Sequence, residues 1–279
     1  MSAVAEIQVD QIREQARRIR IDVIKMLTKA KSGHTGASLG LADVMATLYF
    51  GGVMKYDAAK PGWDERDRFV LSCGHACPVL YATLARAGFF PMGWLDTLRT
   101  FGTKLQGHPS RHDTPGIETA AGSLGQGSAV SVGMAMALKT DGKPNRVFTV
   151  ISDGECEEGS TWEAAMAAAH FGCDNLTWIC DRNYLQIGGS TEKITSLDPL
   201  HGKFAAFNWH VIDVDGHDIG QLLAAIGQAK LNSGSPTIIL AHTTMGKGVS
   251  FFENDYTYHG KAPKPEQAEA ALRELGETA

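Results

Sequence analysis

The chain has 279 residues, of which 43% are hydrophobic and 20% charged, and this composition supports a large buried core and argues against disorder. The 26 basic and 31 acidic residues give a net charge of −5 and are interspersed, which argues against nucleic-acid binding. No stretch approaches the roughly 20 apolar residues that cross a bilayer, and residues 1–20 resemble neither a secretion signal nor a transit peptide. We expect a soluble cytoplasmic protein.

The first half of the chain predicts several helices around one short strand. Apolar residues recur at helical spacing over 9–31 and again over 39–50. Residues 68–72 are short and apolar, as a buried parallel strand should be, and helices are predicted over 75–87 and 125–138. The last of these helices is rich in Ala, Met and Gly, which indicates close packing against its neighbours.

The second half alternates strand-like and helix-like segments. The strand-like runs are residues 147–151, 176–180, 209–214 and 237–241, and helical patterns over 162–171 and 219–230 lie between most of them. This alternation predicts an α/β fold, in which a parallel sheet is flanked by helices on both faces. Because no repeat or long linker interrupts the pattern, we expect residues 1–279 to form one domain with a short helical tail over 266–275.

Polar side chains follow two of the predicted strands. Residues 152–155 (Ser-Asp-Gly-Glu) follow one strand and residues 181–183 (Asp-Arg-Asn) follow the next. Ligands bind at the carboxyl ends of strands in parallel sheets, and oxygen ligands from Asp153, Asn183 and a backbone carbonyl suit a hard cation such as Mg²⁺. The alternative is that the carboxylates of 153–158 only cap the following helix.

Glycine-flanked loops carry further polar groups. Residues 121–127 open a helix and could present backbone N–H groups to a diphosphate, although such loops are also common as plain turns. Histidines in predicted loops could move protons near neutral pH, although a single loop histidine is more often a surface residue. These histidines are His34, His75, His108 and His259.

The five cysteines are scattered and odd in number, which argues against a disulfide framework. Cys73 and Cys77 flank His75, so a zinc site is an alternative use of this segment. No second ligand pair follows at zinc-site spacing, and we therefore favour reduced cysteines.

Together these segments resemble the amino-terminal half of transketolase, from about Arg13 to about Pro263. The motifs, in the family's order, are Lys31-Ser-Gly-His34-Thr-Gly36, Asp67-Arg-Phe-Val-Leu-Ser-Cys-Gly-His75, Gly107-His-Pro109, Thr114-Pro-Gly-Ile-Glu118 with Gly122-Ser-Leu-Gly-Gln-Gly127, Asp153-Gly154 through Asn183, and His259-Gly260. The resemblance implies the thiamine-diphosphate-binding fold of the diphosphate-binding (PP) type. It also implies transfer of a two-carbon ketol unit from a ketose to an aldose.

The same resemblance assigns roles to particular residues. Asp153, Asn183 and the carbonyl of Leu185 would hold Mg²⁺, or Ca²⁺ or Mn²⁺, against thiamine diphosphate. The residues expected to contact the cofactor are His75, Gly122, Ser123, Leu124, Gly154, Glu155, Asn183 and Ile187. His34, His108 and His259 would surround the reacting end of the sugar, and Glu158 would link two active sites across a dimer. Arg182 lies near the predicted metal, so its side chain is expected to point away or to meet phosphate.

The resemblance does not extend to the family's pyrimidine-binding and C-terminal domains. We therefore expect a partner subunit that carries them, in an α2β2 assembly that is active only as a whole. Sugar phosphates, sulfonated sugars and branched sugars all remain candidate substrates. Two alternatives stay open, namely a subunit of another thiamine-diphosphate enzyme, such as a deoxyxylulose-phosphate synthase, and a non-catalytic protein that binds only the cofactor or a partner.

Overall fold

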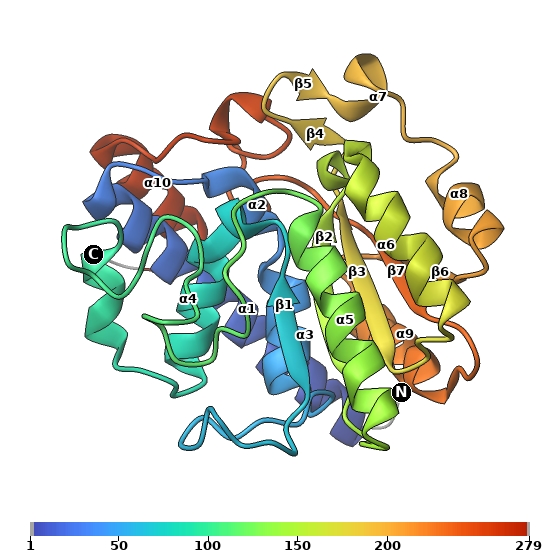
Figure 1. Cartoon of the computed structure of the whole chain (residues 1–279). Coiled ribbons are helices and arrows are strands. Elements are labelled where there is room, and N and C mark those ends of the chain that lie inside the picture. The colour runs from blue at the N-terminus through green and yellow to red at the C-terminus, as the bar shows by residue number, and fades with distance from the viewer. Residues whose placement is uncertain (1–2, 278–279) are drawn as a thin grey trace.

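The computed structural model describes residues 3–277 and contains the predicted parallel sheet (Figure 1). The five strands are parallel and lie in the order β1-β2-β3-β7-β6. They are β1 (Arg68–Leu71), β2 (Val147–Ser152), β3 (Leu176–Arg182), β6 (His210–Asp215) and β7 (Thr237–His242). A two-stranded hairpin of β4 (Leu185–Gln186) and β5 (Gly189–Ser190), which the sequence does not predict, follows β3.

Helices cover both faces of the sheet, as predicted, because alternate side chains of each strand point to opposite faces. In β2, Phe148 and Val150 join one apolar cluster, whereas Val147 and Ile151 join the other. The first cluster includes α1 (Ala3–Ala30), α3 (Ala42–Phe50), α4 (Cys77–Arg86) and α9 (Ile219–Leu231). The second includes α5 (Gln126–Thr140), α6 (Gly159–His170) and α8 (Leu200–Ala206), and α5 and α6 lie in front of the sheet in Figure 1.

The remaining helices are short, apart from the predicted tail. They are α2 (Thr35–Gly40), α7 (Thr191–Ile194), α10 (Pro265–Glu274) and 3-10 turns at Gly74–Ala76, Met92–Thr97, Gly154–Glu157 and Tyr256–Tyr258. The helix predicted over 39–50 corresponds mainly to α3, which begins at Ala42, whereas residues 39–40 belong to the preceding α2. No helix within the described residues is long and apolar enough to span a membrane.

Two glycines allow loops at the carboxyl end of the sheet to pack closely. A Cβ at Gly74 would lie 1.8 Å from the carbonyl oxygen of Ala121, and a Cβ at Gly127 would lie 2.7 Å from the Cα of Ser72. Both distances are shorter than any van der Waals contact, so neither position accepts a larger residue without movement of the backbone. The loop after β1 can therefore pack directly against the segment that leads into α5 because these two positions have no side chain.

Candidate active site

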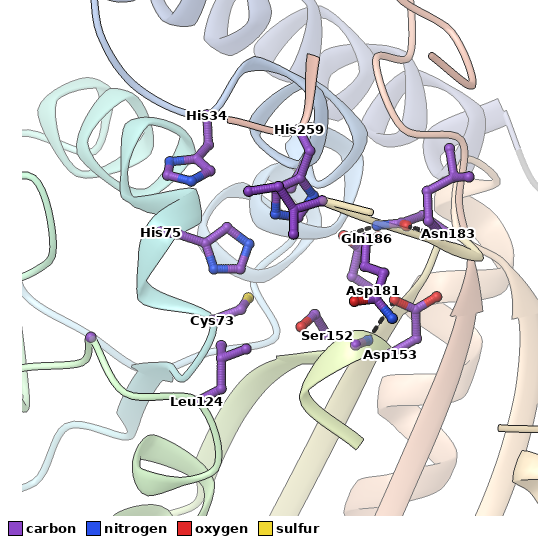
Figure 2. A pocket seen from close by; sticks show the side chains of 15 residues that line it. His34, Cys73, His75, Leu124, Ser152, Asp153, Asp181, Asn183, Gln186 and His259 are labelled. Atoms are coloured by element: carbon purple, nitrogen blue, oxygen red, sulfur yellow. Dashed lines mark hydrogen bonds between the residues drawn. The ribbon is translucent and has the colours of Figure 1, made fainter. Parts of the chain in front are cut away.

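A cavity of about 270 Å³ lies at the carboxyl ends of β1, β2 and β3 (Figure 2). The sequence predicts a ligand site at this edge of the sheet. The predicted site residues that line the cavity are His34, His75, Gly122, Leu124, Asp153, Gly154, Asn183, Leu185, Ile187 and His259. Residues from six separate segments of the chain are thus brought to one cavity.

Three imidazoles meet on one side of the cavity (Figure 2). His34 precedes α2, His75 lies in the 3-10 turn after β1, and His259 follows the turn Tyr256–Tyr258. Their ring centroids are 5.0 Å apart for His34 and His75, 5.2 Å for His75 and His259, and 5.7 Å for His34 and His259. Within the described residues, Nδ1 of His34 and Nδ1 of His259 are buried without a hydrogen-bond partner.

Burial keeps these imidazoles neutral near pH 7. Burial, with the nearby His34, lowers the pKa of His75 to about 3, and burial, with the nearby His259, lowers the pKa of His34 to about 4. Burial also lowers the pKa of His259. A neutral imidazole has one N–H donor and one acceptor nitrogen, so each ring can both give and receive a hydrogen bond.

Asp153 lies on the opposite side of the cavity, directly after β2. Its Oδ1 accepts a hydrogen bond from the Gly154 amide at 2.8 Å, and its Oδ2 accepts one from the Tyr184 amide at 2.6 Å. Burial, together with the neighbouring Asp181 carboxylate, raises the pKa of Asp153 to about 7. The capping alternative is correct in part, because Asp153 caps the 3-10 turn, but the same side chain also lines the cavity.

Asp181 fixes the side chain of Asn183, and the sequence assigns it no role. The Asn183 Nδ2 donates to Oδ2 of Asp181 at 2.9 Å, while the Asn183 Oδ1 accepts from the Leu185 amide at 2.9 Å. Asp181 is buried and also accepts a hydrogen bond from the hydroxyl of Thr243. Its place at the end of a strand was a usable signal, because Asp153 and Asn183 are recognised by the same rule.

The Arg182 side chain does not line the cavity and reaches toward α7, although it also contacts Asp153. The buried guanidinium lies 3.4 Å from Oδ2 of Asp153 and forms ion pairs with Glu192 at 2.6 Å and Asp198 at 2.9 Å. Its centre also lies 4.0 Å from the ring centroid of Tyr184. A buried charge requires a partner, and the carboxylates of Glu192 and Asp198 hold this cation next to Asp153.

The other predicted residues do not line the cavity. His108 is exposed and lies beside Gly122, where an added Cβ would be 3.7 Å from its ring. Ser123 and Glu158 are also exposed. Glu155 is buried, and its carboxylate accepts hydrogen bonds from the hydroxyl of Ser72 and, at 2.8 Å, from the Gly125 amide. Its carboxylate is thus used to hold the loop before α5, where the sequence predicts a cofactor contact.

The zinc alternative for Cys73, His75 and Cys77 gains no support from the structure. In residues 3–277, no group of three or more His, Cys, Asp or Glu side chains is arranged to hold a metal ion. All five cysteines are free and buried. The predicted Mg²⁺ ligands comprise one carboxylate, one amide and one backbone carbonyl, so this finding leaves that prediction untested.

The chain matches the family model described as transketolase, thiamine diphosphate binding domain, over residues 11–278. It is 45% identical over 272 residues to the 6-deoxy-6-sulfo-D-fructose transketolase subunit SqwG of a Clostridium species, covering 98% of each chain. It is 40% identical over 270 residues to an apulose-4-phosphate transketolase subunit of Phocaeicola vulgatus, covering 97% of this chain and 95% of that one.

Its fold matches the solved transketolase of Leishmania mexicana with a TM-score of 0.90 and 35% identity. That match covers 95% of this chain and 41% of the Leishmania chain, so the present chain spans about two fifths of the solved enzyme. The chain therefore belongs to the transketolase family and represents its thiamine diphosphate binding domain.

Proposed function

We propose that this chain is the N-terminal subunit of a two-subunit transketolase, which transfers a two-carbon ketol unit from a ketose to an aldose. The observation that carries the proposal is the meeting of three neutral imidazoles with Asp153 and Asn183 across one cavity. A plain structural cavity does not require unpartnered imidazole nitrogens on one side and an oxygen-rich strand end on the other. We also propose that residues 1–279 form one domain.

The residues present fit thiamine diphosphate and a divalent cation. Asp153, Asn183 and the carbonyl of Leu185 would hold Mg²⁺, or Ca²⁺ or Mn²⁺, and His75 and Gly154 would contact the diphosphate. Gly122, Ser123, Leu124 and Ile187 would lie along the rest of the cofactor. The hydrogen bonds of Asn183 support this assignment, because they fix its amide oxygen and nitrogen in one orientation. Thiamine diphosphate, when bound, supplies the electron sink that cleavage of a carbon–carbon bond in a ketose requires.

The histidines would handle protons and orient the sugar. His34 and His259 each have a buried Nδ1 that is unpartnered among the described residues. We propose that these two rings bond a sugar carbonyl or hydroxyl. Because their pKa values are lowered, both rings are neutral near pH 7 and can each donate and accept a hydrogen bond. His108 lies at the rim beside Gly122, where it would bond the substrate's hydroxyls, and Glu158 would face a second active site.

The proposed partner is a separate subunit with the pyrimidine-binding and C-terminal domains, in an α2β2 assembly. Two relatives that match almost end to end are named as subunits, which supports this proposal. Their names specify a sulfonated sugar and a sugar phosphate, so we propose a ketose whose distal end carries an anionic group of this kind. Binding of that group would fall to the partner subunit.

The test is a ketol-transfer assay with Mg²⁺ and thiamine diphosphate, with 6-deoxy-6-sulfo-D-fructose and apulose 4-phosphate among the donors. The chain is assayed alone and after mixing with a candidate partner subunit that carries the pyrimidine-binding and C-terminal transketolase domains. We expect activity only in the mixture, and loss of that activity in Asp153→Ala. The matched control is Asp141→Ala, at the exposed C-terminal end of α5, which should keep full activity.

Other outcomes lead to different conclusions. Activity in the chain alone would contradict the need for a partner. An inactive mixture that nevertheless binds the cofactor would favour another thiamine-diphosphate reaction. A mixture that neither binds the cofactor nor transfers a ketol unit would favour a non-catalytic protein.

A further inference from the structure

Arg99 connects the two loops that carry His34 and His108. Its Nη1 donates to the hydroxyl of Ser32 at 2.8 Å, and its Nη2 donates to the carbonyl oxygen of Gly107 at 3.2 Å. Ser32 lies two residues before His34, and Gly107 lies directly before His108. One guanidinium therefore spans two segments that are more than 70 residues apart in the sequence.

We propose that Arg99 is a positioning residue, which ties the His34 loop to the His108 loop and so fixes the two imidazoles relative to each other. The inference rests on the proposed function, because the relative position of the rings matters only if both act on one substrate. A planar guanidinium suits this task better than an ammonium group, since its donors point in fixed directions.

The backbone around Arg99 is shaped for this contact. Arg99 has a φ of +59°, which is uncommon for a residue with a side chain and is tolerated here because its amide bonds the carbonyl of Leu105 at 3.0 Å. The buried side chains of Leu98 and Leu105 anchor the same turn. A Cβ at Gly107 would lie only 3.1 Å from Nε of Arg99, so glycine lets the guanidinium lie against this backbone.

The Arg99 charge also acts on both imidazoles. Burial is the first cause of the lowered pKa of His34, and the Arg99 cation contributes to it, whereas at His108 burial and Arg99 together lower the pKa. A purely structural arginine elsewhere in the protein would not affect both rings. This double influence gives the proposal a readout that does not depend on catalysis.

The test uses three variants of the full chain and follows the imidazole carbon–proton signals by NMR as a function of pH. Arg99→Met removes the charge and both hydrogen bonds, and should shift the signals of His34 and His108 and raise both titration midpoints. Ser32→Ala removes one bond only, and should shift the signals of His34 and leave those of His108 in place. Arg146→Met is the matched control.

Arg146 is a suitable control because it makes the same kind of contact outside the cavity. Its guanidinium donates at 2.8 Å to the carbonyl oxygens of Asp174 and Ala229, and its Nε, like that of Arg99, is buried without a partner among the described residues. Arg146→Met should lower the melting temperature and leave the signals of both histidines unchanged. Arg99→Lys keeps the charge and replaces Arg99→Met if the latter does not fold.

Two results would overturn the proposal. In the first, Arg99→Met lowers the melting temperature but leaves both histidine signals unchanged. In the second, Ser32→Ala shifts His108 as much as His34. In the assembled enzyme, we expect Arg99→Met to lower kcat about tenfold or more with a much smaller change in KM, because misplaced groups slow the chemical step. If the assembled parent enzyme is inactive, the proposed function fails, and the NMR result still decides whether Arg99 ties the two loops.

Discussion

Helix α5 contains a matched pair of glycines whose replacement by alanine should have opposite effects. Gly127 lies in its first turn, where an added Cβ would be 2.6 Å from Oγ and 2.7 Å from Cα of Ser72. Gly133 is exposed in the same helix, and an added Cβ there meets no atom of the described residues within 4 Å. The two substitutions are chemically identical and differ only in what surrounds them.

The expected magnitudes follow from helix propensity and from overlap. Alanine is favoured over glycine in a helix by up to about 1 kcal/mol, so Gly133→Ala should raise the free energy of unfolding by that amount. At Gly127 the methyl group would push α5 away from the end of β1, at a cost of roughly 1–3 kcal/mol for overpacking. It would also disturb the 2.8 Å hydrogen bond from the Ser128 amide to Oγ of Ser72, worth about 1 kcal/mol. The net loss at Gly127 is therefore roughly 1–3 kcal/mol.

Urea denaturation of the isolated chain, followed by tryptophan fluorescence, measures both values. For a chain of this size each kcal/mol corresponds to roughly 2–4 °C in melting temperature, so Gly127→Ala and Gly133→Ala should be clearly separated by heating as well. Equal or greater stability of Gly127→Ala compared with the parent would refute the reasoning, since it would mean that the loop after β1 is not packed against α5 as described. Unequal denaturant slopes would instead indicate a change in the unfolded states.

Three further predictions concern the cavity. The pKa of His75 is lowered from 6.5 to about 3, so the stability from its neutral form is present above pH 6.5 and lost as the pH falls. The melting temperature of His75→Asn should therefore fall less than that of the parent between about pH 7 and pH 4, and equal falls would contradict this. Arg182→Met leaves Asp153 buried beside no cation and should cost about 3–5 kcal/mol in urea denaturation, where a loss below about 1 kcal/mol would contradict the buried pair. Asp181→Ala should weaken Mg²⁺ binding about 10- to 100-fold in calorimetric titrations with thiamine diphosphate. Asp181→Asn keeps an acceptor for Asn183 and should lose much less Mg²⁺ affinity, and equal losses of affinity in the two variants would indicate that charge alone matters.

The fold was largely predictable because its central strands β2, β3 and β7 are buried along almost their whole length. Segments such as β2 and the first five residues of β3 are mostly apolar, and the helices between strands show a 3.6-residue period, so their alternation specifies a parallel sheet. The hairpin of β4 and β5 was not predictable, because strands of two residues carry no periodic pattern. The break between α2 and α3 at Leu41 was not predicted, because the apolar helical pattern over 39–50 runs through it.

The residues that line the cavity were easier to predict than those that support them. Asp153 and Asn183 follow strands, and His34, His75 and His259 adjoin glycines, so local sequence marks each of them. The direction of a side chain after a strand is a different matter. Arg182 could turn toward solvent or inward, and the choice depends on its ion pairs with Glu192 in α7 and with Asp198 in the segment after it.

Two of the supporting residues, Glu155 and Arg99, make contacts that sequence patterns miss. Besides its bond to a serine hydroxyl, the Glu155 carboxylate accepts a hydrogen bond from the Gly125 amide, and Arg99 donates one to the Gly107 carbonyl. In both cases a charged side chain binds a backbone group that any residue type provides. Such a contact leaves no mark on the partner's side chain. Substitution of Glu155 or Arg99 should therefore move the cavity loops although every residue that lines the cavity is unchanged. Cofactor binding and catalysis should be impaired even though all the predicted ligand residues are present.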